Sequence, residues 1–344
     1  MKNPFLFNFA VSYSGGGHKR LYEYAKWFNV NGGAWFVVHP NCDYLVSEFP
    51  NNKFFFARQS WWQRLFSDCA YLELIKQEVG EPDLYYSYGI PIYTRVGKIN
   101  WFHLSNVLPL VLHNVPISLV DWLKFAFLGW RFKRNFANAE VISAESQYSL
   151  GLISGDHNDK LFLSVNGGDD ELAQTVINTG HAKANFATVV GTYKYKAVDH
   201  ALVVFEMLKK ENPQLKLRLI GSEEALPDRL RLREDVLVMG LLKRSEVIDC
   251  LRTSKFYISM TYIENSYNAA SEGVFLADES YISDIGPHQE LLAGINFRRI
   301  AFQSIGRNIL HINRHDISAC NLKSWNNVVS DMILRFNECR AMIQ

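Results

Sequence analysis

"IENSYNAASEGVF", residues 263–275, places two carboxylates, Glu264 and Glu272, on either side of a predicted helix start. Asparagines and a serine follow the first glutamate, and such side chains favour helix N-termini because they accept bonds from unpaired backbone N–H groups. A helix N-terminus attracts phosphate, whereas carboxylates accept hydrogen bonds from hydroxyls. The stretch therefore suits a ligand with hydroxyls on both sides of a diphosphate, although its spacing alone also fits a solvated helix face.

Length and composition limit the function classes. A chain of 344 residues exceeds one ordinary core and fits two domains of about 150 residues. A net charge of +1 provides no global attraction to nucleic acid, so we expect no such partner. The five cysteines are scattered without CxxC spacing, which indicates neither a disulfide framework nor a zinc site and favours a cytoplasmic, reducing location. No apolar run reaches the ~18 residues of a membrane-spanning helix.

Short apolar runs alternate with helical patterns along most of the chain, as in "FATVVGTY" followed by "DHALVVFEMLKKENP". This alternation is typical of a parallel sheet covered on both faces. The rhythm breaks at residues 166–186, which are rich in Gly, Asn and Asp, so we expect an interdomain hinge there. The predicted fold class is α/β, with two Rossmann-like parallel-sheet domains facing a cleft.

The residues after the opening stretch carry a resemblance to a known family. Glu264 and Glu272 match the Glu, seven residues, Glu motif of family four of the retaining GT-B glycosyltransferases, and "SDIGPHQE", 283–290, resembles the family's SD-x-G-x-x-x-E segment. "NGGDD", 166–170, resembles its hinge, and Ser324–Trp325 resembles the start of its closing helix. The resemblance implies an acceptor domain at 1–168, a nucleotide-sugar donor domain at 169–318 and a closing helix at 319–344.

The same resemblance implies roles for the residues of the motif. Glu272 would bind the ribose hydroxyls of the donor, and Glu264 would hold hydroxyls of the transferred sugar. The backbone N–H groups of Tyr267 and Asn268 would hold the diphosphate. Glu264 is thereby counted among the catalytic residues for binding and orientation, without being assigned as a covalent nucleophile.

Two further loops supply candidate donor-binding residues. Gly15, Gly16 and Gly17 lie between a predicted strand and helix, where glycines permit close approach to an anion, although a plain turn fits as well. "GTYKYK", 191–196, resembles the family's diphosphate-binding segment, in which Lys196 matches a lysine that we assign to catalysis and donor binding. Thr192 stands where the family has arginine, and we expect Lys194 to substitute for it.

His103 ends the predicted strand "INWFHLS", where the family often has a histidine near the sugar, and it is the third catalytic candidate. A structural histidine is the alternative. Residues 121–136 mix Trp and Phe with Lys and Arg, which suits an anionic membrane surface or a helix with aromatics packed inward. No two aspartates are separated by one residue and no His/Cys cluster is present, so we expect no metal and no cofactor.

The resemblance, together with the absence of a metal motif from the sequence, implies a metal-independent retaining hexosyltransferase. It would use a nucleotide diphosphate sugar and a glycan or lipid-linked oligosaccharide acceptor, in bacterial O-antigen, capsule or lipopolysaccharide synthesis, and associate peripherally with the inner face of the plasma membrane. Two alternatives stay open. A GT-B nucleotide-sugar epimerase or hydrolase would turn over the donor without an acceptor, and a non-catalytic binding protein would bind nucleotide without turnover.

Overall fold

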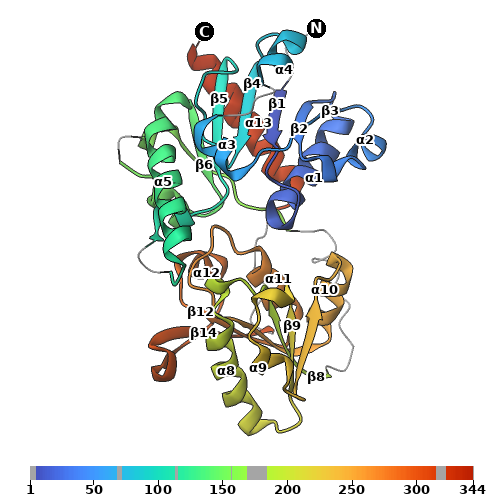
Figure 1. Cartoon of the computed structure of the whole chain (residues 1–344), viewed down its shortest axis with the longest axis vertical. Coiled ribbons are helices and arrows are strands. Elements are labelled where there is room, and N and C mark those ends of the chain that lie inside the picture. Colours follow the sequence, from blue (N-terminus) through green and yellow to red (C-terminus); the bar gives the residue numbers. More distant parts are fainter. Residues whose placement is uncertain are drawn as a thin grey trace. The chain divides into compact units, whose positions relative to one another are not determined.

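The computed structural model describes residues 5–67, 72–112, 115–155, 157–168, 184–314 and 323–343. The chain divides into two compact units, each with one seven-stranded sheet (Figure 1). The first unit comprises Met1–Leu112, Leu119–Gly167 and Lys323–Gln344, and the second comprises His113–Ser118 and Gly168–Leu322. Most of the predicted hinge and the boundary at 318 lie outside the described residues, so the predicted domain limits stay predictions.

The sheet of the first unit is entirely parallel, in the order β3-β2-β1-β4-β5-β6-β7. Its inner strands are almost continuously apolar and buried, as expected when helices cover both faces of a parallel sheet. The strands are β1 (Phe5–Phe9), β2 (Trp35–Val38), β3 (Lys53–Phe56), β4 (Leu84–Tyr88), β5 (Ile99–Leu104), β6 (Val141–Ala144) and β7 (Leu161–Leu163).

Two long helices, α1 (Gly15–Val30) and α13 (Trp325–Ile343), pack against each other in this unit. Their buried faces join an aromatic core that includes Phe7, Phe36 and Trp101. The remaining helices are α2 (Leu45–Glu48), α3 (Trp61–Phe66), α4 (Leu72–Val79), α5 (Leu119–Asn135) and α6 (Gln147–Gly151), with short 3-10 turns at Pro40–Cys42, Leu108–Leu110, Phe136–Asn138 and Asn158–Lys160. The predicted closing helix thus belongs to the core of the first unit.

The sheet of the second unit has the order β10-β9-β8-β11-β12-β14-β13. The strands from β8 to β12 pair in parallel, but β14 is antiparallel to β12 and β13 is antiparallel to β14, so the sheet is parallel only over five strands. The strands are β8 (Ala184–Val190), β9 (Lys216–Ile220), β10 (Val236–Gly240), β11 (Ser254–Ser259), β12 (Glu279–Ser283), β13 (Arg298–Phe302) and β14 (Arg307–Asn313).

Helices pack two separate apolar clusters onto this sheet. Gly273 of α11 shows how closely one helix approaches, because a Cβ built there would lie 2.2 Å from the ring of Tyr257 on β11. The helices are α8 (Val198–Glu211), α9 (Asp228–Arg231), α10 (Arg244–Arg252), α11 (Asn268–Leu276) and α12 (Gly286–Leu291), with 3-10 turns η6 (Lys194–Lys196), η7 (Glu223–Ala225) and η8 (Gln303–Ile305). Among the described residues, no helix is long and apolar enough to cross a membrane.

Candidate functional site

The predicted donor residues of the second unit gather at the carboxyl edge of its sheet. The strand order reverses between β8 and β11, and open α/β sheets bind ligands at such switch points. The turn η6 follows β8, and the loop leading to α11 follows β11. The backbone N–H of Tyr262 donates to the carbonyl of Tyr195 over 2.8 Å, and the Thr261 hydroxyl donates to the same oxygen over 3.1 Å. The lysine turn and the first motif glutamate are therefore brought together by the backbone.

Lys196 and Glu264 form an ion pair, with side chains 13% and 19% exposed. Burial lowers the pKa of Lys196, but the charge and hydrogen bond of Glu264 outweigh burial and leave that pKa raised. The next residue, Ala197, has φ 49°, a left-handed conformation that is strained for a residue with a Cβ and is frequent at functional sites. The protein thus holds a charged lysine beside the glutamate of the motif.

The position where the family has arginine contributes no charge here. Thr192 is buried, and its hydroxyl donates to the carbonyl of Ser222 over 2.8 Å. Lys194 is exposed on the same turn as Lys196. The cations of this loop are therefore its two lysines, of which Lys196 is fixed by a carboxylate.

The helix α11 begins at Asn268, directly after the loop that carries Glu264. Tyr267 occupies its N-cap position without a side-chain hydrogen bond to the first turn. The positive end of the helix dipole accordingly lies near the Lys196 turn, which suits an anionic group. Glu272 lies one turn further along α11, on the same helix face as Asn268.

Glu272 is not solitary, because its Oε1 accepts a hydrogen bond from Nη1 of Arg244 over 2.6 Å. Arg244 is the first residue of α10, which follows β10 at the same edge of the sheet. The sequence analysis did not identify Arg244. Arg244 follows the end of a predicted strand, which is a position typical of ligand-binding residues. The segment "LLKRSEV" contains two adjacent cations, however, and does not indicate which of them contacts Glu272.

His288 is a second residue that the sequence analysis missed. It is fully buried in α12, and its Nδ1 lies 2.8 Å from the carbonyl oxygen of Ser283 and therefore donates to it. Burial lowers the pKa of His288, while the charge of Glu264 opposes this effect. Its Nε2 is buried without a hydrogen-bond partner in the part of the chain that the structure describes. His288 is therefore a neutral, buried imidazole close enough to Lys196 and Glu264 for their charges to affect its pKa.

In the first unit, the predicted glycine loop begins α1 immediately after β1. Gly15 has φ +64°, a conformation that favours glycine. A Cβ at Gly17 would lie 2.8 Å from Cε1 of Tyr88 and 3.1 Å from the Ser12 hydroxyl oxygen. Gly16 between them is exposed. The loop is thus packed directly on the end of β4 at the switch point between β1 and β4.

His103 is completely buried at the end of β5, and both of its ring nitrogens have partners. Its Nε2 lies 3.4 Å from Glu145, which also accepts a hydrogen bond from the Tyr88 hydroxyl over 3.1 Å. Burial, followed by the charge of Arg20, lowers the pKa of His103 to about 4. Burial raises the pKa of Glu145, but the hydrogen bond from His103 and the charge of Arg20 outweigh it and leave that pKa lowered.

The lowered pKa values of His103 and Glu145 mean that the ring is neutral and the carboxylate is ionised, which fixes the tautomer of His103. A carboxylate only accepts, so the single proton of the neutral ring lies on Nε2 and is donated to Glu145. Nδ1 then accepts from the Ser143 hydroxyl over 2.8 Å, and that hydroxyl oxygen accepts from the indole N–H of Trp101 over 2.7 Å. His103 is therefore part of a buried network that ties β4, β5 and β6 together, and its catalytic role stays a prediction.

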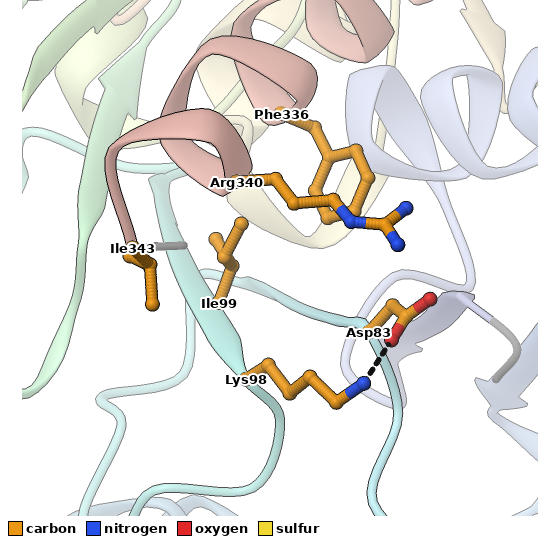
Figure 2. Close-up of a pocket in the computed structure, with 6 residues that line it drawn as sticks. All are labelled: Asp83, Lys98, Ile99, Phe336, Arg340 and Ile343. Carbon is orange, nitrogen blue, oxygen red and sulfur yellow. Dashed lines mark hydrogen bonds and ion pairs between the residues drawn. The ribbon is translucent and has the colours of Figure 1, made fainter.

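A pocket in the first unit lies at the opposite edge of the sheet from these residues (Figure 2). It lies at the amino ends of β4 and β5, where Asp83 and Lys98 form an ion pair of 2.8 Å, opposite to the edge that carries the glycine loop. It contains none of the predicted site residues. Its lining residues are Asp83, Lys98, Ile99, Phe336, Arg340 and Ile343.

Comparison with known proteins gives structural likeness and no match in sequence. No protein-family profile matches the chain, and no curated protein matches it significantly. Sucrose-phosphate synthase from Thermosynechococcus elongatus is similar in structure, with a TM-score of 0.66 at 12% identity, over 99% of this chain and 100% of that one.

Two other solved structures are similar over most of their length. HepE from Anabaena, crystallised with UDP and glucose, gives a TM-score of 0.60 at 18% identity and covers 85% of this chain and 84% of its own. A UDP-forming alpha,alpha-trehalose-phosphate synthase from Burkholderia vietnamiensis gives 0.52 at 9% identity, with 86% of both chains covered. These neighbours have the GT-B fold, and the chain shares that α/β fold, as the sequence predicted.

Proposed function

We propose that this protein is a retaining glycosyltransferase that moves a sugar from a nucleotide diphosphate sugar to a glycan acceptor. The observation that carries the proposal is the convergence of Lys196, Glu264 and Glu272 around the start of α11, at the carboxyl edge of the second sheet. A fixed cation, two carboxylates and a helix N-terminus together match the charges and hydroxyls of such a donor. The structural likeness to HepE, crystallised with UDP and glucose, adds support.

In this proposal each donor group meets a complementary protein group. Glu272 accepts hydrogen bonds from the ribose hydroxyls, and Glu264 accepts from hydroxyls of the transferred sugar. The N–H groups of Tyr267 and Asn268 bind the diphosphate together with the lysine turn. Negative charge builds on the diphosphate as its bond to the sugar breaks, and fixed positive groups stabilise that state more than the ground state.

The charge on Lys196 fits this role. Its raised pKa keeps the ammonium protonated at neutral pH, and Glu264 holds it in place before any donor arrives. Because the cation is already oriented, little reorganisation is needed when charge develops on the diphosphate. We assign no metal to this step, and Lys194 supplies the second cation that Thr192 does not.

For the first unit we propose the role of acceptor domain. A Cβ built on Gly15 would have no atom within 4 Å, so the first turn of α1 is open there and suits an anionic group of donor or acceptor. His103 is proposed to act near the transferred sugar through the buried network with Glu145.

A lipid-linked oligosaccharide is the acceptor that the surface of the first unit favours. α5 and the neighbouring α3 expose several large apolar side chains, and a Phe66–Phe127 ring contact at 5.9 Å joins the two helices. These residues, here called the aromatic surface, are Trp62, Phe66, Leu119, Val120, Trp122, Leu123, Phe127 and Trp130.

Cations border the aromatic surface. The guanidinium of Arg134 lies 5.3 Å from the ring of Trp130, and Lys133 is exposed beside it. Exposed indole rings next to cations suit the interface of a membrane with anionic headgroups. We therefore propose peripheral binding to the inner face of the plasma membrane, in assembly of a bacterial surface polysaccharide such as O-antigen, capsule or lipopolysaccharide.

Turnover measurements test the proposed function. The purified protein is incubated with nucleotide-sugar donors, with and without lipid-linked acceptors extracted from bacteria, and release of nucleoside diphosphate and formation of glycosylated lipid are followed. We expect acceptor-dependent release, a retained anomeric configuration and full activity in excess EDTA. Donor turnover without an acceptor would instead indicate an epimerase or hydrolase, and tight binding without any turnover would indicate a non-catalytic binding protein.

A matched pair of variants ties the activity to the site. Glu264→Gln removes the charge of the first motif glutamate, whereas Glu211→Gln removes an exposed carboxylate at the end of α8, before β9 and so at the opposite edge of the sheet. Loss of transfer in the first variant with full transfer in the second supports the assignment. Equal transfer in both variants would contradict it.

A further inference from the structure

Arg244 contacts the proposed donor site directly, through a hydrogen bond to Glu272. Arg244 is not among the site residues predicted from the sequence. Its Nη1 donates to Oε1 of Glu272 over 2.6 Å, a length typical of a charge-assisted hydrogen bond. The Glu272 side chain is 12% exposed, while that of Arg244 is 41% exposed. The carboxylate is thus mostly enclosed, and the cation that fixes it lies at the surface.

The start of α10 is itself held in place, which limits where Arg244 can lie. Glu246 accepts a hydrogen bond from the backbone N–H of Lys243 over 2.7 Å, so one carboxylate fixes the residue before Arg244. α10 also packs against α11, the helix that carries Glu272. Arg244 therefore projects from an anchored helix end, and its planar guanidinium provides donors in a rigid arrangement.

A glutamate side chain has several rotatable bonds, and its carboxylate binds two hydroxyls well only in a restricted set of orientations. Holding one oxygen by a fixed donor reduces the entropy lost when a ligand binds. The fixed donor also orients the plane of the carboxylate. That orientation determines which ribose hydroxyls can donate a hydrogen bond to it. These considerations give Arg244 an effect on the ligand that passes through Glu272.

We propose that Arg244 is a positioning residue of the donor site: it orients Glu272 to accept hydrogen bonds from the ribose hydroxyls of a nucleoside diphosphate. The proposal rests on the proposed function, since it takes Glu272 to be the ribose-binding residue. Arg244 thereby determines how strongly the site distinguishes a ribonucleotide from its 2′-deoxy form. An exposed ion pair that served stability alone would have no such effect.

The test measures dissociation constants for UDP and dUDP by titration calorimetry. If the protein prefers a purine nucleotide, the GDP/dGDP or ADP/dADP pair is used instead. The variants are Arg244→Ala, Arg244→Lys, Glu272→Gln and the double variant Arg244→Ala/Glu272→Gln. Lys243→Ala is the matched control, because it removes an exposed cation from the neighbouring position.

We expect the unaltered protein to bind UDP about tenfold or more tightly than dUDP, as for one lost hydrogen bond to a charged group. Arg244→Ala should weaken UDP binding about tenfold and reduce the preference for the ribonucleotide, and Arg244→Lys should restore only part of it. The double variant should bind UDP no more weakly than Glu272→Gln, since Arg244 acts through Glu272. Lys243→Ala should retain both affinities.

Three results overturn the inference while leaving the proposed function intact: unchanged UDP/dUDP preference in Arg244→Ala, additive losses in the double variant, or an equal loss in Lys243→Ala. A different result overturns the proposed function itself, namely that the unaltered protein binds none of the nucleoside diphosphates. Circular dichroism and thermal melting of each variant establish that it is folded.

Discussion

Lys196 is the residue whose chemistry bears most directly on the reaction. A cation held at a departing diphosphate typically contributes ~10²–10³ in turnover, and Thr192, which the resemblance aligns with an arginine, adds no charge to this loop. We predict that Lys196→Ala lowers kcat at least tenfold, with a smaller loss for Lys194→Ala, because only Lys196 is fixed by Glu264. Steady-state kinetics with circular dichroism as the folding control checks this. A folded Lys196→Ala protein with unaltered turnover would show that this turn does not hold the diphosphate.

Gly17 gives a second prediction at the scale of one residue. Its missing side chain leaves room for the ring of Tyr88, which cannot move away because it stacks on His103 and is bonded to Glu145. Gly17→Ala should therefore lower the free energy of unfolding by about 1–3 kcal/mol, as overpacking of a close contact does. Gly151→Ala is the control, since it lies in α6 with no atom within 4 Å of a Cβ. Equal stability of both variants in urea denaturation would refute the packing argument.

The limits of sequence reasoning are clear at this scale. Glu264 and Glu272 could be proposed from the sequence because they match a family motif whose residues are close together in the chain. Arg244 was not predicted, because its contact with Glu272 depends on how α10 packs against α11. That packing cannot be inferred from the spacing of residues in one segment. Burial of His288 likewise follows from the sheet and not from its neighbours in sequence.

Among elements, the buried network between β4, β5 and β6 makes stability depend on pH. The pKa of His103 is lowered to about 4 in the folded protein, whereas an unfolded histidine has a pKa near 6.5. The unfolded state therefore binds a proton first as pH falls, and stability decreases from about pH 6.5 down to about pH 4. The lowered pKa of Glu145 adds stability that is present above its ordinary pKa and is lost at lower pH.

We predict that the free energy of unfolding falls by about 2 kcal/mol between pH 7 and pH 5 through His103 alone. The measurement is urea denaturation at several pH values for the unaltered protein and for His103→Gln. Other histidines titrate in both proteins, so the difference between the two pH profiles isolates His103. If the two profiles were parallel, His103 would not be the buried neutral imidazole described here.

The strands and helices themselves were largely predictable from the sequence. The strands from β8 to β12 and the helices between them follow the alternation of apolar runs and helical patterns. The edge strand β13 was not predicted because Arg298 and Arg299 interrupt its apolar pattern. An edge strand tolerates polar side chains on positions that an inner strand must bury.

At the scale of the whole molecule, the aromatic surface should govern binding to membranes. We predict that the protein sediments with vesicles containing anionic lipid and that the Trp122→Ser/Trp130→Ser variant binds at least tenfold more weakly, because buried indole area is lost. Leu232→Ser/Leu334→Ser removes exposed apolar side chains elsewhere and serves as the control. Binding should also fall as salt rises. Equal binding by both double variants would contradict the assignment of this surface.

The α/β fold with two sheets could be predicted from the sequence because its signal is repeated along the chain. The hydrogen bond between Thr261 and the Tyr195 carbonyl joins two segments 66 positions apart, one after β8 and one after β11, and could not be read from any local segment. The resemblance to a family suggested the roles that we propose for the motif residues, and the sheet topology explains why these residues lie at one edge.

The central claim is that the carboxyl edge of the second sheet binds a nucleoside diphosphate. A titration of UDP, GDP, ADP and dTDP into the unaltered protein, Glu272→Ala and the control Glu211→Ala tests it most directly. The account predicts that at least one of these ligands binds the unaltered protein and Glu211→Ala equally, and binds Glu272→Ala about tenfold or more weakly. Equal affinity of the Glu272→Ala protein, or no binding of any of the four ligands, would contradict it.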